Sequence, residues 1–128
     1  MEEVCFKMAI GIIGAVGKSN EKITYSDHDV TLVASQGGTD NWIPYSTAGT
    51  NCHVYDLRFT DLPGANLTTS SDVTVLPRGT ISESMLTNFS QINAVETGTF
   101  NDLDVVRFYS MTGKPTSDIQ ITLRVLNQ

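Results

Sequence analysis

Alternation of apolar and polar side chains constrains the fold of this chain more than any other feature. Four apolar residues near the C-terminus occupy every second position: Ile119, Ile121, Leu123 and Val125. Successive side chains of a β-strand point to opposite faces, so this segment is expected to be a strand with one buried face. The segment 53–59 has the same alternation and would place these residues on one side: His53, Tyr55, Leu57 and Phe59.

Turn-forming residues separate these segments from further apolar and β-branched ones. We expect additional strands within residues 3–12, 29–35, 72–77 and 103–110. Clusters of Gly, Pro, Asn and Asp lie between them, and these residue types favour turns. Many short strands with such turns predict a mainly β fold, either an antiparallel sandwich or a jelly-roll-like barrel. The length of 128 residues predicts one domain over residues 1–128.

One segment has helical rather than strand periodicity. Thr80 stands three residues before Glu83, which is the spacing of a capping box at a helix N-terminus. Apolar residues then follow at helical spacing: Ile81, Met85, Phe89 and Ile92. The sequence therefore predicts one short amphipathic helix over about 81–92, which would cover an end or an open face of the sheets.

Charge and hydropathy disfavour two classes of partner. The net charge is −6, and the eight Lys and Arg residues are scattered along the chain. Nucleic acids and anionic membranes attract clustered basic residues, so we expect neither as a partner. The longest nearly apolar run, 8–16, is shorter than the ~20 residues that a spanning helix needs, so no membrane insertion is expected.

The two cysteines, Cys5 and Cys52, are expected to be reduced thiols, with a disulfide bridge between them as the alternative. The N-terminal segment contains Glu2 and Glu3 where a secretory signal would carry basic residues. Without an export signal, disulfides are uncommon, and both cysteines lie in segments expected to be apolar strands.

A glycine-rich stretch at 9–20 resembles a phosphate-binding loop only superficially. Gly17, Lys18 and Ser19 match the end of the motif, but the first glycine should then stand at position 12, which is Ile12. The residues that follow alternate like strands, whereas the motif requires a helix there. We therefore expect a structural role for these glycines, and no cofactor.

Asp27 and Asp29 are the candidate metal ligands. They flank His28, and residues two apart in an extended chain share a side. A metal site needs further converging ligands, and the alternative is a solvated turn before the strand. An enzyme that uses Asp27, His28 or His53 is the least favoured of the functional hypotheses.

A longer loop around the only tryptophan is the candidate ligand-binding site. It brings together residues with the chemistry of sugar recognition: Asp40, Asn41, Trp42, Tyr45 and Asn51. Aromatic faces stack on sugar rings while amides and carboxylates supply hydrogen bonds, and loops on a rigid β scaffold often carry such sites. The alternative is that Trp42 closes one end of the sandwich. Asn66 and Asn88 each begin an N-glycosylation triplet, a pattern that also arises by chance in a Ser/Thr-rich chain.

The composition favours a protein of a particle or an exterior surface. Polar residues are mostly uncharged Ser, Thr and Asn, and only 17% of residues are charged. Virion proteins are made without a leader and then persist outside the cell. We therefore expect a non-enzymatic structural, assembly or host-attachment protein of a virus or phage particle. Its partners would be further copies of the chain and other particle subunits. It would reside at the virion or extracellular surface, with the cytoplasm as an alternative. The alternative function is a carbohydrate-binding module or lectin that uses the Trp42/Tyr45 loop and binds a surface glycan.

Overall fold

The computed structural model describes residues 23–45, 51–79 and 82–127. The strand expected within 3–12, the glycine-rich stretch with Lys18, and Cys5 lie outside the described residues.

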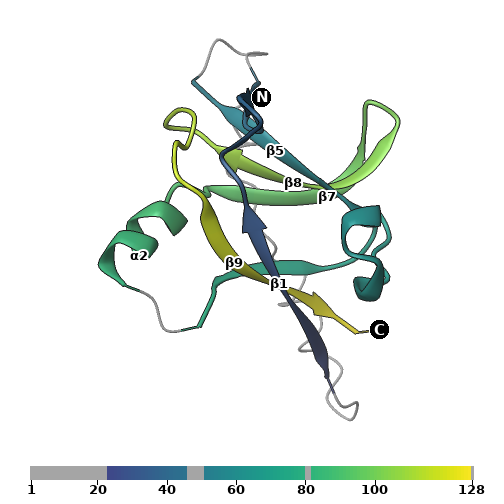
Figure 1. Cartoon of the computed structure of the whole chain (residues 1–128). Helices are drawn as coiled ribbons and strands as arrows, with labels where there is room; N and C mark the ends of the chain where they lie inside the picture. The colour runs from purple at the N-terminus through teal and green to yellow at the C-terminus, as the bar shows by residue number, and fades with distance from the viewer. Residues whose placement is uncertain (1–22, 46–50, 80–81, 128) are drawn as a thin grey trace.

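The described residues form two antiparallel sheets with one α-helix, α2, so the predicted mainly β fold is confirmed, in its sandwich form (Figure 1). The three-stranded sheet has the order β1 (Tyr25–Leu32), β9 (Ile119–Leu126), β6 (Val73–Pro77). The four-stranded sheet has the order β4 (Ile43–Pro44), β5 (His53–Arg58), β8 (Leu103–Ser110), β7 (Ala94–Phe100). A small ribbon pairs β2 (Ser35–Gln36) with β3 (Thr39–Asp40). β1 and β6 therefore lie at the two ends of their sheet.

The predicted alternation places the main core between the two sheets. The four apolar residues of β9 are buried and pack with β1 residues such as Val30 and Leu32. β5 contributes Leu57 to this core, with Tyr55 packed against it. Phe59 also packs there, although it begins the short 3-10 helix η2 (Phe59–Asp61) rather than continuing the strand.

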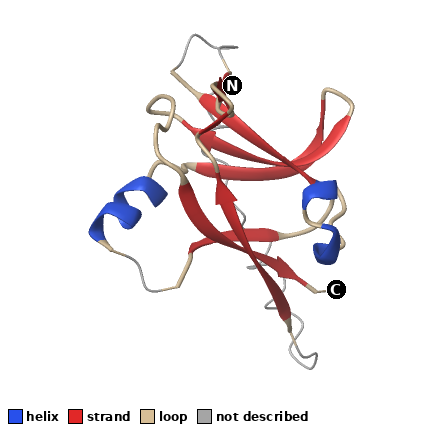
Figure 2. Ribbon diagram, in the orientation of Figure 1, coloured by secondary structure: helices blue, strands red, loops and turns tan. Residues whose placement is uncertain are grey.

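The α-helix is shorter than predicted and begins at a different cap. α2 spans Glu83–Phe89, and the hydroxyl of Ser82 accepts a hydrogen bond from the Met85 amide at 3.3 Å. Ser82 is therefore the N-cap, and the capping box expected from Thr80 is wrong. Phe89 and Ile92 still pack against the core, Ile92 from beyond the helix. Figure 2 shows α2 at one side of the sandwich and the 3-10 helices at the other.

The central strand β8 is buried on both of its faces. Val106 and Phe108 face the core between the sheets, while Val105, Arg107 and Tyr109 point to the other side and are also buried. A second apolar cluster lies on that other side and contains Cys52, Val54, Ala94 and Tyr109. Period-2 alternation predicts one buried face, so the second one did not show in the sequence.

Two short 3-10 helices connect β5 to β6 and were not predicted. η2 is followed by η3 (Pro63–Ala65), which ends at Asn66 in the left-handed conformation, with φ 52° and ψ 46°. Asn is one of the few residues other than Gly that adopt this conformation readily. The next loop is connected to β7, because the Thr97 hydroxyl donates to the Ser71 carbonyl at 3.1 Å. This connection fixes the loop beside the ends of β1 and β9.

Cys52 is disulfide-bonded, so the expectation of a reduced thiol at this position is wrong. Its Sγ lies 4.0 Å from the carbonyl oxygen of His53, beside the second apolar cluster. Disulfides persist in oxidising compartments and are rare in reducing ones. Among the described residues, no helix has the length and apolar character needed to cross a membrane.

Candidate functional site

The residues of the predicted ligand loop are mostly engaged in structural contacts. Asp40 forms an ion pair with Lys114 at 2.7 Å. The Asn41 side chain donates to the carbonyl of Val33 at 2.7 Å. Asn51 is exposed, and its backbone carbonyl lies 3.4 Å from Nδ1 of His53.

Trp42 and Tyr45 lie on opposite faces of the four-stranded sheet, so they do not form one binding platform. Trp42 is 0% exposed and belongs to the core between the sheets, where its ring lies 5.4 Å from that of Tyr55. Tyr45 packs against the second apolar cluster, 6.1 Å from the ring of Tyr109. The expectation that Trp42 stacks on a ligand is wrong, because its ring closes the core and presents no face to solvent.

The predicted metal ligands are engaged by the neighbouring strand. Asp27 and Asp29 share one side of β1, as expected, but Asp27 accepts two hydrogen bonds from Arg124 at 2.8 and 2.9 Å. Asp29 accepts one from the Thr122 hydroxyl at 2.9 Å. Within the described ranges no group of three or more His, Cys, Asp or Glu residues is placed to hold a metal ion. Asp27 and Asp29 therefore connect β1 to β9, and we propose no metal site at these residues.

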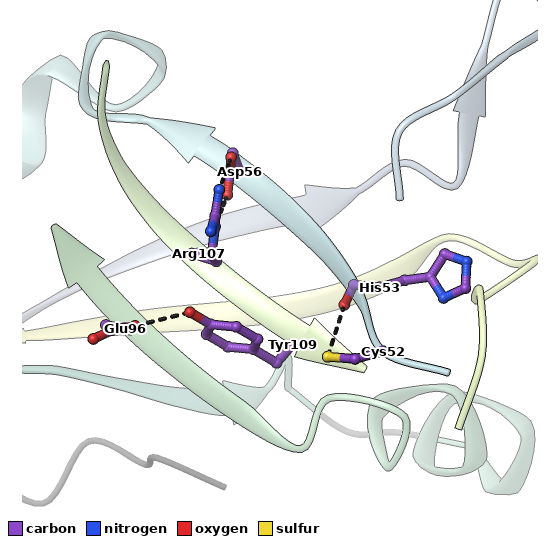
Figure 3. A network of polar contacts seen from close by, with 6 residues as sticks. All are labelled: Cys52, His53, Asp56, Glu96, Arg107 and Tyr109. Atoms are coloured by element: carbon purple, nitrogen blue, oxygen red, sulfur yellow. Dashed lines mark hydrogen bonds and ion pairs between the residues drawn. The ribbon is translucent and has the colours of Figure 1, made fainter. Parts of the chain in front are cut away.

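A network of polar contacts lies on the second face of the four-stranded sheet (Figure 3). Arg107 on β8 donates two hydrogen bonds to Asp56 on β5, at 2.8 and 2.9 Å. Its guanidinium carbon lies 3.9 Å from the centroid of the Phe100 ring, a cation–π contact. The Tyr109 hydroxyl donates to Glu96 on β7 at 2.8 Å. The network connects three adjacent strands.

The pKa shifts of this network are those of structural groups. Burial alone would lower the pKa of Arg107, but the hydrogen bonds and negative charge of Asp56 outweigh burial and raise it. Burial, together with the hydrogen bond to Glu96, raises the pKa of Tyr109 well above its ordinary value. Arginine thus stays charged and tyrosine stays neutral near pH 7.

The two histidines named in the enzyme hypothesis also have local contacts. His28 Nε2 lies 3.1 Å from the hydroxyl of Ser26, a neighbour on its own strand. His53 contacts the carbonyl of Asn51, as above, and lies at the start of β5.

A hollow of about 490 Å³ lies where the end of β9 passes the start of β1 and the loop after η3. We call it the Asn66 hollow. Six side chains with hydroxyl or amide groups line it: Ser26, Asn66, Thr68, Ser70, Ser71 and Asn127. The rest of the lining is Gly64 and an apolar part made of Ala65, Val125 and Leu126. In Figure 1 the C-terminal end of the chain lies beside the 3-10 helices that border this hollow.

Sequence reasoning missed this hollow because its lining comes from three distant segments. Ser26, the loop 64–71 and the residues 125–127 meet through the pairing of β9 with both β1 and β6. Each segment alone is an ordinary Ser/Thr/Asn-rich stretch. The Asn66 triplet and the turn residues at 61–66 were the only local signals, and neither indicates a cavity.

The fold and this site define the protein as an antiparallel β-sandwich with a neutral surface hollow and an internally paired polar network. No known protein family, curated protein or solved structure matches the chain.

Proposed function

We propose that this chain is a non-enzymatic structural, assembly or host-attachment protein of a virus or phage particle, and that it acts through surface contacts. One observation carries the proposal: the acidic side chains are used to connect strands and loops of the sandwich. Six of them accept a hydrogen bond from a distant part of the chain: Asp27, Asp29, Asp40, Asp56, Glu96 and Asp118. Asp61 and Asp104 accept one from a residue three and five positions away. Carboxylates that are hydrogen-bonded in this way stabilise a scaffold.

The disulfide at Cys52 supports an exterior location. Disulfides are stable in oxidising surroundings such as virion surfaces and are rare in the reducing cytosol. The scarcity of charged residues and the abundance of Ser, Thr and Asn agree with this location.

Assembly is tested by the mass of the full chain, purified with its disulfide intact. We expect light scattering behind a sizing column to give one defined multiple of the monomer mass over a wide concentration range. A monomer at every concentration, including in the presence of the other particle proteins, would contradict the assembly function.

Two matched variants locate the contact surface. Ile43 on β4 and Leu86 on α2 are the most exposed large apolar residues of the described chain, at 52% and 51% exposure. We expect either Ile43→Glu or Leu86→Glu to dissociate the oligomer while the subunit keeps its β-sheet circular dichroism spectrum. The variant that leaves the oligomer intact then serves as the control. If both variants keep the oligomer, the assembly contact does not include these apolar positions.

A second candidate function, carbohydrate binding, is favoured by a different observation from the one first expected. The Trp42/Tyr45 loop does not provide a platform, but the Asn66 hollow offers neutral hydrogen-bonding groups beside apolar surface. This combination is compatible with host attachment through a glycan.

A further inference from the structure

Among the described residues, the Asn66 hollow has no charged side chain in its lining. The ten described lining residues have hydroxyl, amide or aliphatic side chains or are glycine. An anionic ligand such as a phosphate would need a cation or a set of aimed amides, and a metal ion would need carboxylates. The lining therefore disfavours charged ligands and favours a neutral ligand that carries many hydroxyl groups.

The walls of the hollow are held in place before any ligand arrives. The Thr68 amide donates to the Ser71 hydroxyl at 2.9 Å, and the Ser71 amide donates to the Thr68 carbonyl at 3.0 Å. On the other wall, the amide of Asn127 donates to the Thr24 carbonyl at 2.9 Å and its side chain donates to the Thr24 hydroxyl at 3.1 Å. A site ordered in this way loses little conformational entropy on binding.

Asn66 has hydrogen-bonding capacity to spare. It is exposed and left-handed at the end of η3, and among the described residues its side chain has no hydrogen-bond partner. An amide presents both donors and an acceptor, which is the pairing that adjacent sugar hydroxyls require. Asn127 also keeps its side-chain oxygen as an acceptor, because its bond to Thr24 uses the amide nitrogen.

We propose that the Asn66 hollow binds a neutral sugar residue of a host glycan. The hydroxyl and amide groups bind the sugar hydroxyls, and the C–H face of the ring packs on the small exposed parts of Ala65, Val125 and Leu126, which are otherwise buried. The volume of about 490 Å³ lies in the range of small-molecule sites. This inference rests on the host-attachment branch of the proposed function and names its ligand class and its site.

The triplet Asn66-Leu67-Thr68 provides a competing use of the same residue. If Asn66 carried an N-linked glycan, that glycan would stand at the mouth of the hollow and exclude an external sugar. The intact mass of the chain isolated from its native source separates the two uses. An unmodified Asn66 is expected, and a glycan at Asn66 would overturn the proposal.

The binding experiment uses the full oxidised chain made in bacteria, where Asn66 stays unmodified. Ligand-observed saturation-transfer NMR is recorded with methyl glycosides of galactose, glucose, mannose and N-acetylglucosamine. Sialic acid, glucuronic acid and inorganic phosphate serve as anionic comparison ligands. We expect at least one neutral glycoside and none of the anions to bind, with affinity unchanged between about 0.1 and 1 M salt, because no charge pair contributes. Binding of the anions alone, or of no ligand, overturns the proposal.

Two variants test the location. Gly64→Phe fills the hollow without backbone strain, since a Cβ at Gly64 meets nothing within 4 Å and its φ is ordinary. Asn66→Asp keeps the shape but replaces donors with a charge. We expect each variant to weaken sugar binding at least about tenfold. Gly64→Phe does so by filling the hollow, and Asn66→Asp does so by losing one or more hydrogen bonds. Asn88→Asp on α2, outside the lining, is the matched control and should bind like the unmodified chain.

The oligomer mass is measured on the same samples. The result of the sugar-binding test can then be distinguished from the result of the assembly test. Amide shifts confined to the lining residues confirm that the variants fold. Loss of sugar binding with the same oligomer mass supports the hollow as the site. Unchanged sugar binding in both Gly64→Phe and Asn66→Asp overturns it, whatever the oligomer does.

Discussion

Two aspartate–arginine pairs, one on each sheet, have nearly the same geometry and very different surroundings. Asp56–Arg107 and Asp27–Arg124 each join paired positions of adjacent strands through two hydrogen bonds of 2.8 and 2.9 Å. Each arginine also lies near an aromatic ring. The arginine and aspartate side chains are 7% and 31% exposed in the first pair, but 39% and 44% in the second. Two ion pairs with the same hydrogen-bond distances therefore need not contribute equally to the free energy of unfolding.

The difference is one of screening by water. At the exposed pair, solvent competes for both charges and weakens their attraction, so such pairs contribute little. At the more buried pair, Arg107 has lost most of its hydration while Asp56 keeps part of it, so Arg107 depends strongly on the charge of Asp56. Removing one partner of the buried pair leaves an uncompensated charge against apolar neighbours. The two pairs thus allow the effect of burial on an ion pair to be compared within one molecule.

The largest effect is expected from Arg107→Met. Loss of the guanidinium leaves Asp56 without its main partner, and the expected cost is about 2–3 kcal/mol, below the full buried-pair value because Asp56 retains some water contact. Urea unfolding with the disulfide intact measures it. The double variant Asp56→Leu/Arg107→Met should recover part of the loss. If it is less stable than the single variant, the unpaired charge is not the cause.

The next largest effect is expected from Tyr109→Phe. It removes one buried hydrogen bond to a carboxylate, worth about 1–2 kcal/mol at neutral pH. Because burial raises the pKa of Tyr109 in the folded chain, its stabilising contribution is full below about pH 10, where the unfolded tyrosine begins to ionise. It is then lost as pH rises towards the folded pKa. The stability difference between parent and variant should therefore shrink in alkaline urea titrations, and a constant difference would contradict this account.

Arg124→Ala should have a small effect that salt removes. The pair with Asp27 is exposed, so we expect the unfolding midpoint to move far less than in Arg107→Met. Any difference seen at low salt should vanish near 1 M salt, where screening acts over about 3 Å. A loss as large as that of Arg107→Met would show that burial does not decide the strength of these pairs.

The smallest effect is the acid response of Asp27. The hydrogen bond from Arg124 lowers the pKa of Asp27 below its ordinary value. A lowered folded pKa gives a contribution that is present above the unfolded pKa of about 4 and is lost as pH falls through the folded one. The stability difference between the parent and Asp27→Asn should be constant near neutral pH and decline only below about pH 4. A difference that grows in acid would reverse the assignment.

The sequence predicted well what depends on one strand at a time. The buried set on β9 and the inward face of β5 followed from alternation alone, because the period of a strand is two. The helix was found by its spacing, but its first turn was misplaced, since Thr80 and Ser82 are both acceptable caps and the sequence does not distinguish them.

The sequence could not predict what depends on distant segments meeting. Trp42 was correctly seen as either a ligand platform or a core residue, and only the position of the second sheet decides between them. The burial of Arg107 depends on a second packed face, which a run such as 103–110 does not reveal. The Asn66 hollow needs the register between β1 and β9, and no local pattern encodes that register.

β1, at one end of the three-stranded sheet, has a consequence for how copies of this molecule could pair. Strands at sheet ends readily add another strand, which is how fibres grow. Two copies of β1 placed antiparallel about His28 would set Asp27 of one against Asp29 of the other, and a register shift of two residues would set Asp27 against Asp27 or Asp29 against Asp29. Like charges facing across such a seam oppose its formation. These carboxylates, of which Asp27 is partly neutralised by Arg124, therefore disfavour amyloid-like stacking along this strand.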